Sequence, residues 1–110
     1  MQVSVAEILE KSRAALLAHG AGKEQAEAVA RAVARAEETG NVICGLYYLE
    51  SYCVQLRSGR VNGTVEPEVS RPAPGCVRVD AGFGFAQPAF ARALPWALEA
   101  ARENGVATLS

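Results

Sequence analysis

The final third of the chain constrains the fold most, because it has the pattern of a strand, a glycine-rich turn, a helix and a second strand. Residues 76–80 alternate between apolar and polar side chains, which is typical of a strand. Gly82 and Gly84 follow, then a helix expected over residues 88–104 and a further strand from Val106. The strands of such a βαβ unit normally lie parallel and buried, and two strands with open edges do not form a stable domain. We therefore expect an α/β protein whose βαβ unit is an incomplete part of a larger fold.

The helix over residues 88–104 carries an apolar stripe and an interior proline. Because Pro95 has no N–H group and crowds the preceding turn, we expect a kink or local break there. The segment at 59–75 contains three prolines and is expected to be extended at a sheet edge, where proline is tolerated. The helical spacing of apolar residues predicts that the stripe is made of Phe90, Leu94, Ala97, Leu98 and Ala101.

Residues 1–60 are expected to form a helical N-terminal portion of three helices, ahead of the start of an α/β domain at residues 61–110. The first helix begins at Ser4, where the S-x-x-E spacing to Glu7 indicates a capping box. It ends at Gly20, since glycine readily adopts the backbone conformation that follows a helix.

The second helix is expected from about residue 23 to residue 39, and the third from about residue 44 to residue 58. The second is rich in alanine on its inner face and charged on its outer face, so it can approach its neighbours closely. The expected apolar stripe of the third helix is Leu46, Leu49, Cys53 and Leu56.

Composition excludes several classes of protein. With a net charge of -1, the 110 residues offer no basic surface for a nucleic-acid backbone. No apolar run approaches the roughly 20 residues that cross a membrane, and the first residues lack the pattern of a signal peptide. The three cysteines are widely spaced without a C-x-x-C motif, which argues against a disulfide framework or a zinc site. We expect a cytoplasmic protein with no nucleic-acid, membrane or metal partner.

The stretch at 41–62 concentrates thiol and phenol groups. Cys44 is expected near the start of the third helix, where unpaired N–H groups can lower the pKa of a thiol and make it reactive. No histidine lies near it in sequence to act as a base, so a packing or supporting role is favoured over a nucleophilic one. Cys53 lies on the apolar stripe and is expected to be an inert core residue. The single histidine, His19, falls in the last turn of the first helix, where a capping role is favoured over a catalytic one.

The Gly82-x-Gly84 turn has the place of a phosphate-binding loop but not its full pattern. The third glycine of such a motif is replaced by Gln87, and no acidic residue follows about 20 residues later. A tight strand-to-helix turn, with Phe83 and Phe85 packed on neighbouring elements, is the stronger interpretation. The N-terminus of the helix that follows could still offer N–H groups to an anion.

Four segments together resemble the malate/L-lactate dehydrogenase family of the non-Rossmann type. They are AEETGN at 36–41, CGLYYLESYCVQLRSGRVNG at 44–63, VDAGFGFAQPAF at 79–90 and ALEAARENGVATLS at 97–110. Members of that family are NAD(P)H-dependent oxidoreductases of 2-hydroxy acids and cyclic imino acids. The family pattern has an Asp-Ser-His-Gly segment, a helix with a tyrosine and an R-x-G turn, which Gly45, Tyr52 and residues 57–59 match in order. The resemblance implies that residues 61–110 begin the cofactor-binding domain.

The resemblance also implies site residues, and it departs from the family at two of them. The catalytic histidine of the family falls on Cys44, and an arginine that meets the substrate carboxylate falls on Tyr48; the preceding Asp-Ser falls on residues 42–43. Cys44 would hold the proton-transfer position, Tyr48 would hydrogen-bond the substrate, and Gly84 with Gln87 would lie near NAD or NADP. Because a thiol replaces an imidazole only if its pKa is tuned near the working pH, either altered acid/base chemistry or a loss of catalysis is implied.

On this resemblance the chain is an N-terminal segment that needs the remainder of the fold, in the same polypeptide or as a separate chain. The expected substrate is a small 2-oxo acid or cyclic imine, and the expected assembly is a homo-oligomer. The 110 residues alone are not expected to turn over substrate. Two alternatives stay open: a non-catalytic binding or regulatory module that retains the fold, and an enzyme that uses Cys44 as a nucleophile.

Overall fold

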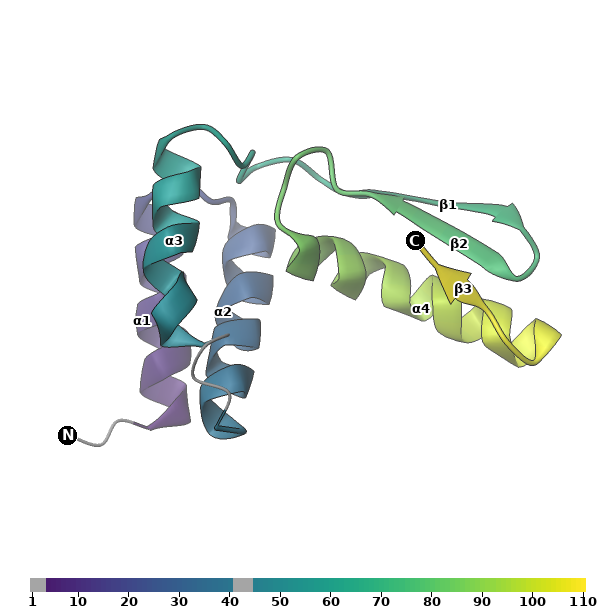
Figure 1. Cartoon of the computed structure of the whole chain (residues 1–110), viewed down its shortest axis with the longest axis horizontal. Helices are drawn as coiled ribbons and strands as arrows, with labels where there is room; N and C mark the ends of the chain where they lie inside the picture. Colours follow the sequence, from purple (N-terminus) through teal and green to yellow (C-terminus); the bar gives the residue numbers. More distant parts are fainter. Residues whose placement is uncertain (1–3, 41–44) are drawn as a thin grey trace.

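The computed structural model describes residues 4–40 and 45–110, which form two lobes that meet at an angle (Figure 1). One lobe holds three upright helices, and the other holds a small sheet with one helix beneath it. The radius of gyration is 15.3 Å, against about 13 Å for a compact domain of this length. The elements are α1 (Val5–Ala18), α2 (Lys23–Glu38), α3 (Leu46–Arg57), β1 (Glu68–Ala73), β2 (Cys76–Asp80), α4 (Ala86–Asn104) and β3 (Thr108–Leu109).

The helical lobe follows the local signals in the sequence. The Oγ atom of Ser4 accepts a hydrogen bond from the N–H of Glu7 at 3.1 Å, so α1 begins at the predicted cap. At the other end of α1, His19 is the C-cap residue, and its Nδ1 lies 2.7 Å from the carbonyl oxygen of Ala15. This position fits the predicted capping role of the histidine.

The core of the helical lobe is built from small and medium side chains. The inner face of α2 is fully buried, and α1 and α3 close over it. Because alanine leaves little bulk between helices, three short helices can bury a continuous core. The buried members of this core include Ile8, Leu16, Ala26, Val29, Ala30, Val33, Cys53 and Leu56.

The stripe predicted for α3 is right at its C-terminal end and wrong at its first position. Cys53 and Leu56 are buried and Leu49 is partly buried, but Leu46 is 41 % exposed. Leu46 is the first residue of α3 and lies where the helix emerges beside the end of α2. Its side chain therefore projects past the core that the later turns of α3 help to form.

The second lobe contains the predicted βαβ unit. β1 and β2 pair antiparallel, with Val69 opposite Val79, and β2 pairs parallel with β3, with Val77 opposite Leu109. The strand order is β1-β2-β3, so the proline-bearing segment forms an edge strand, as predicted. The last strand, β3, begins at Thr108 and is shorter than expected. Val106, where the strand was predicted to begin, lies before β3 and is exposed. This α/β architecture, three helices followed by a βαβ unit, is the one predicted.

One face of the sheet is covered by α4, but not through the large residues of the predicted stripe. Ala93 and Ala100 pack with Val77 of β2, and Ala97, a member of the stripe, packs against them. Small residues let the helix lie close to the sheet, which places the larger residues of the stripe to one side. Three of those residues, Phe90, Leu94 and Leu98, are exposed. The buried residues of α4 are Pro88, Ala89, Ala93 and Ala100.

The helix α4 runs without interruption through Pro95, so the predicted local break does not occur. Pro95 lies on the exposed side of the helix, as does Ala91 one turn earlier. The carbonyl of Ala91, which loses its usual N–H partner at Pro95, therefore lies on the exposed side of the helix, where the cost of that loss is small.

Candidate functional site

An aromatic cluster lies where the two lobes meet. The rings of Tyr48 and Tyr52 stack one turn apart on α3, with centroids 6.2 Å apart, because residues four positions apart share one side of a helix. Tyr47 meets Tyr48 edge-on at 5.7 Å, and Tyr52 meets Phe85 edge-on at 5.4 Å. Solvent exposure therefore increases along the cluster. Phe85 is buried at one end, whereas Tyr47 and Tyr48 at the other end are 77 % and 42 % exposed.

Two of the site residues predicted from the sequence converge on this cluster. The side-chain Nε2 of Gln87 donates a hydrogen bond to the hydroxyl oxygen of Tyr52 at 3.4 Å. Tyr48 stacks on that same tyrosine, so Tyr48 and Gln87 lie on two sides of Tyr52 although 39 positions separate them in the sequence. The arrangement brings two phenols and an amide together in one region.

Gly84 has a packing role in the turn before α4. A Cβ atom added there would lie 2.8 Å from a methyl group of Val65 and 3.0 Å from both the carbonyl oxygen of Ala81 and the side-chain nitrogen of Gln25. The absence of a side chain at Gly84 therefore lets the turn press against the loop before β1. A cofactor contact for Gly84 stays a prediction from the family resemblance.

The N–H groups of the turn are already used within the protein. The N–H of Gly82 donates to Oδ1 of Asp80, that of Gly84 donates to the carbonyl oxygen of Ala81, and that of Phe85 donates to Oε1 of Gln25, at 2.9, 2.9 and 3.1 Å. A phosphate-binding loop needs such groups to point at the ligand. The turn is therefore a structural strand-to-helix turn, which agrees with the stronger of the two interpretations of its sequence.

The two phenylalanines of the turn have different environments. Phe85 is buried against Tyr52, as predicted, whereas Phe83 is 87 % exposed, so the expectation that it packs on a neighbour is wrong. Phe83 has a φ of 64°, in the left-handed region that bulky residues rarely adopt. Its carbonyl oxygen accepts a hydrogen bond from the N–H of Asn62 at 2.9 Å, which helps to hold this conformation.

Gln25 connects the lobes, and the sequence analysis did not identify it. Its side chain is buried, with Nε2 donating to the carbonyl oxygens of Asn62 and Val65, both at 2.9 Å. Its Oε1 accepts the N–H of Phe85. One amide thus joins α2, the loop before β1 and the start of α4. The signal available in the sequence was a glutamine one turn before Val29, on the otherwise apolar inner face of α2.

The N-terminus of α3 carries a carboxylate from α2. Oε1 of Glu37 accepts the N–H of Leu46 at 2.8 Å, and a Cβ atom added to Gly45 would lie 2.4 Å from that same oxygen. Gly45, which matches the glycine of the family motif, thus leaves room for Glu37. Cys44 lies outside the described residues, so its predicted position at the proton-transfer site stays a prediction.

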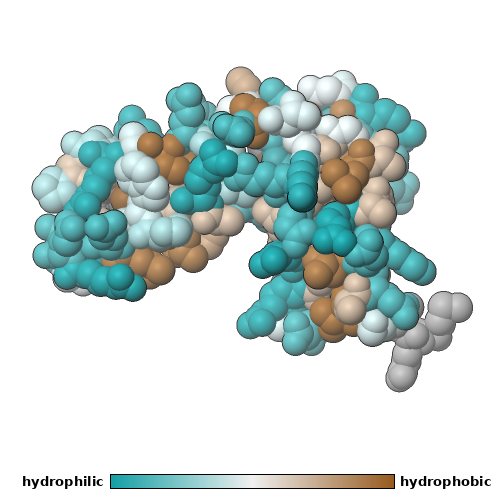
Figure 2. All heavy atoms as spheres, turned by 180° about the vertical axis from the view of Figure 1, so that it is seen from behind, coloured by the Kyte–Doolittle hydropathy of each residue, from teal (hydrophilic) through white to brown (hydrophobic). Residues whose placement is uncertain are grey.

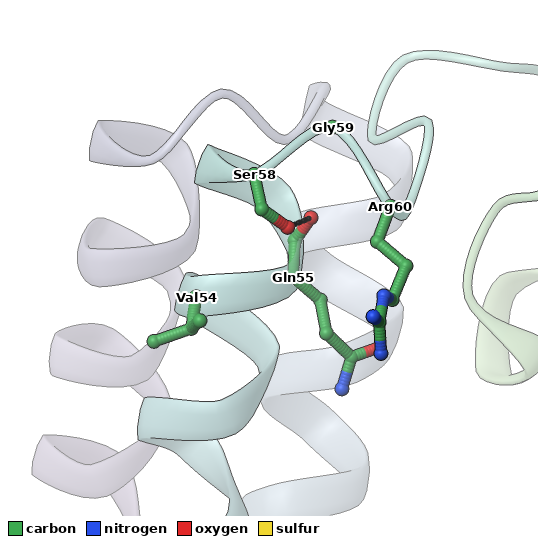
Figure 3. A pocket seen from close by; sticks show the side chains of 5 residues that line it. All are labelled: Val54, Gln55, Ser58, Gly59 and Arg60. Carbon is green, nitrogen blue, oxygen red and sulfur yellow. Dashed lines mark hydrogen bonds between the residues drawn. The ribbon is translucent and has the colours of Figure 1, made fainter.

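A separate hollow lies on the outer side of α3. It is lined by Val54, Gln55, Ser58, Gly59 and Arg60, with the side chains of Gln55 and Arg60 on one side and that of Val54 on the other (Figure 3). The hydroxyl of Ser58 donates to the carbonyl oxygen of Gln55 at 3.2 Å. Of the predicted site residues that the structure describes, Tyr48, Gly84 and Gln87 do not line this hollow, so it is distinct from the aromatic cluster.

The described cysteines differ in environment. Burial raises the pKa of the Cys53 thiol, and the positive charge of Arg57 offsets part of that rise. Cys53 therefore has the inert core character predicted for it, whereas Cys76 is exposed on the sheet. Across residues 4–40 and 45–110, no group of three or more His, Cys, Asp or Glu side chains could hold a metal ion. No helix in that part of the chain is both long enough and apolar enough to cross a membrane.

Comparison with known proteins identifies the family. A sequence model described as malate/L-lactate dehydrogenase matches residues 3–110. The chain belongs to this family. The resemblance predicted from the four sequence segments is thereby confirmed, and the match covers both lobes.

Several members of the family are close relatives of this chain. The chain is 38 % identical over 110 residues to a Delta(1)-pyrroline-2-carboxylate reductase of Ancylobacter novellus. It is also 38 % identical over 108 residues to a (2R)-3-sulfolactate dehydrogenase (NADP(+)) of Chromohalobacter salexigens. The matches cover 100 % and 98 % of this chain and 32 % of each relative. The chain thus spans about a third of the length of the curated relatives it matches.

Solved structures of the family share the fold of the whole chain. A delta1-piperideine-2-carboxylate reductase from Pseudomonas syringae pv. tomato superposes with a TM-score of 0.96 at 35 % identity, covering 100 % of this chain and 33 % of the reductase. A malate dehydrogenase from Pyrococcus horikoshii OT3 superposes with a TM-score of 0.88 at 24 % identity, covering 99 % of this chain and 31 % of that enzyme, and shows the fold alone. The two lobes are therefore the form that this segment takes within a complete family member.

Proposed function

We propose that the chain supplies the N-terminal segment of an NAD(P)H-dependent oxidoreductase that acts on a small 2-oxo acid or cyclic imino acid. The observation that carries this proposal is the likeness of the whole chain, at 38 % identity, to a pyrroline-2-carboxylate reductase. Because another relative is a sulfolactate dehydrogenase, the proposed substrate class also includes 2-hydroxy acids. Residues 61–110 would begin the cofactor-binding domain, with residues 1–60 as the helical portion beside it.

The aromatic cluster gives the substrate-facing residues definite tasks. Tyr48 presents its phenol at the exposed end of the cluster, where it would donate a hydrogen bond to a substrate carboxylate or carbonyl oxygen. Stacking on Tyr52 orients the Tyr48 ring, and the hydrogen bond from Gln87 orients Tyr52 in turn. Cys44 would hold the proton-transfer position that the family gives to histidine.

The residues of this chain fit a nicotinamide cofactor only in part. The turn at Gly84 uses its N–H groups internally and does not offer a cradle for the phosphates. Gln87, whose amide lies beside the Tyr52 hydroxyl, is the better placed of the two predicted cofactor residues. A bound NADH or NADPH would supply the hydride, and residues outside this chain would hold its phosphates. The complete enzyme would work as a homo-oligomer, as the family resemblance implies, and in the cytoplasm, which the pattern of widely spaced cysteines favours.

A second candidate is a non-catalytic module that keeps the family fold and binds a partner or ligand. The observation that favours it is the cysteine at position 44, where the family pattern has a catalytic histidine. The two candidates differ in one measurable property, because only the oxidoreductase needs a nicotinamide cofactor.

The first experiment is to purify the native material, determine its intact mass and subunit composition, and titrate it with NADH and NADPH by fluorescence. The oxidoreductase proposal expects cofactor binding by an assembly that contains the chain, with turnover of Δ1-pyrroline-2-carboxylate or of 2-oxo acids. If the purified material binds neither cofactor, the oxidoreductase proposal is wrong and the non-catalytic module is the remaining candidate. A Cys44→Ser variant that keeps the full rate removes the thiol from the mechanism.

The role of Tyr48 is tested in the same assembly with a matched pair of variants. Tyr48→Phe removes one hydroxyl from the proposed substrate contact and is expected to raise KM about tenfold, the typical effect of one lost hydrogen bond to a charged group. Tyr47→Phe removes the hydroxyl of the more exposed neighbour and is expected to leave KM unchanged. Equal effects of the two variants would contradict the assignment of Tyr48.

A further inference from the structure

The helix α4 carries a second apolar face that none of the described residues 4–40 and 45–110 covers. Phe90 and Leu98 are 55 % and 50 % exposed, and Leu94 lies between them on the same side of the helix. Figure 2 shows hydrophobic side chains along the lower edge of the left lobe, where α4 lies. Large apolar side chains in a continuous row on a surface mark a contact with another element far more often than an isolated exposed residue does.

The exposed row continues into an apolar groove between α2 and α4. The groove is lined on the α2 side by Ala28, Arg31 and Ala32. On the α4 side it is lined by Ala86, Gln87, Phe90 and Ala91, so it borders the candidate site at Gln87. We use the name outer α4 surface for this groove together with Phe90, Leu94 and Leu98.

The opposite side of the lobe has a different character. The face of the sheet that points away from α4 presents Cys76, Arg78 and Asp80 of β2, all of them exposed. Residues at the alternate positions, Val77 and Val79, face α4. An element that adds apolar contacts to this lobe therefore finds them on α4 and not on the free face of the sheet.

We infer that the outer α4 surface is a docking face for the part of the family fold that this chain does not contain, which covers it with an apolar layer. The curated relatives are about three times as long as their match to this chain, so two thirds of each lies outside it. The match to a complete reductase chain has a TM-score of 0.96, so α4 takes the same place beside α2 within the larger protein. An unusually large radius of gyration agrees with an inner angle that another element fills. This inference rests on the family and the packing, and it does not depend on the proposed activity.

The test compares two matched pairs of variants in two proteins. One protein is the 110-residue chain itself, and the other is a chimera in which this chain replaces the matching part of the Ancylobacter novellus reductase. Phe90→Glu places a charge on the outer α4 surface, and Phe83→Glu places the same charge at a more exposed phenylalanine on the turn. Leu98→Glu and Val106→Glu form a second pair in the same way. Thermal unfolding of all forms is followed by circular dichroism.

The inference expects an effect that depends on the larger protein. In the chain alone, all four variants shift Tm by less than about 2 °C, because each replaces an exposed residue. In the chimera, Phe90→Glu and Leu98→Glu lower Tm by about 5 °C or more, because each then buries an unpaired charge. Phe83→Glu and Val106→Glu keep their small shifts. Equal shifts for a variant in the chain and in the chimera would overturn the inference.

Two further outcomes are decided by separate measurements. If the chimera has no cooperative transition, the remainder of the reductase is produced alone and titrated with the chain. Phe90→Glu should then weaken binding at least tenfold and Phe83→Glu should not, whereas no binding by the native chain overturns the inference. Sedimentation of the chain alone tests a second copy as the occupant. A dimer that Phe90→Glu dissociates, with no extra loss of Tm in the chimera, would assign the surface to self-association instead.

Discussion

The helices α2 and α4 are both rich in alanine, but they differ in how far their larger apolar residues are buried. In α2, the inner face is fully buried between α1 and α3, including Val29 and Val33. In α4, the buried residues are Pro88 and three alanines, and the larger Phe90 and Leu98 remain exposed. The difference shows that the helical lobe completes its own core within this chain, whereas the second lobe buries one side of its helix and leaves the other for a further layer.

The two lobes also differ in what holds each together. The helical core contains Phe85 from the start of α4, so the lobes share one apolar contact at the junction. The second lobe has a small core of its own, whose fully or nearly fully buried members are Val77, Ala93 and Ala100. Polar contacts add to the junction through Gln25, and through Arg92, whose Nε donates to Glu24 at 3.1 Å. Much of the join between the lobes is therefore made of hydrogen bonds, which are sensitive to single substitutions.

The largest expected difference in stability is between a substitution in the helical core and one on the exposed face of α4. Leu16→Ala removes a side chain that is fully buried in the helical core and should lower the free energy of unfolding by about 3 kcal/mol. Leu98→Ala removes the same atoms from the half-exposed face of α4 and should cost less than about 1 kcal/mol. Urea unfolding followed by far-UV circular dichroism measures both. Similar losses would mean that the two helices do not differ in the way described.

The next effect concerns the junction. Gln25→Leu keeps the volume but leaves the N–H of Phe85 and two loop carbonyls without their side-chain partner. The free energy of unfolding should fall by about 2 kcal/mol, and hydrogen exchange of the Phe85 amide should become faster. Gln55→Leu is the control, because among the described residues its side chain bonds to Ser51 on the same helix face, and the change should cost less than about 0.5 kcal/mol. Unchanged exchange at Phe85 would show that Gln25 does not hold the junction.

The next prediction is smaller, and it is a gain in stability rather than a loss. Ser12 is fully buried in the helical core, and its hydroxyl has no hydrogen-bond partner among the described residues. Ser12→Ala removes this unsatisfied group and inserts a better helix former, so stability should rise by about 1 kcal/mol. Ser4→Ala removes the cap hydroxyl that accepts from Glu7 and should lower stability by about 1 kcal/mol. A loss for both serines would show that the Ser12 hydroxyl is satisfied in solution.

The smallest effect is electrostatic. Hydrogen bonds from Arg31 and then from Arg13 hold the pKa of Glu27 below its ordinary value. The charged carboxylate is thus favoured in the folded state, so its contribution is present above a pH of about 4.3 and is lost as the pH falls through the lowered pKa. Glu27→Gln should lower Tm at pH 7 by less than about 2 °C and should have no effect at pH 2 or in 1 M salt. Glu38→Gln, at an exposed glutamate of the same helix, should change Tm at neither pH.

Local signals in the sequence were enough to locate the helices and strands. The strand predicted at 76–80 is β2 without a shift, and the second helix differs from its prediction only at its last residue. Caps, glycines and prolines act within a few residues, so they can be recognised without knowledge of the rest of the fold. The family motifs were recognised in the same way and are confirmed by the match over residues 3–110.

The direction of α4 and the role of Gln25 could not be read from local signals. Burial is decided by what packs on a face, and the largest apolar side chains of α4 belong to a face that this chain leaves open. The amide of Gln25 bonds to residues 37, 40 and 60 positions away, and no periodic pattern encodes such contacts. At the site, the sequence named Tyr48 and Gln87, but Tyr52 as their shared neighbour emerged only from the packing of α3 against the start of α4.

The parallel pairing of β2 with β3 has a consequence for synthesis on the ribosome. The helical lobe ends at Arg57, so its core, apart from Phe85, can close while the rest of the chain is still being made. β3 emerges only after β2 and α4, and it must find β2 across the whole of α4, a slow, long-range step. During that interval the edge of β2 is open to other nascent chains. The α/β lobe is therefore exposed to wrong strand pairing during synthesis for longer than the helical lobe.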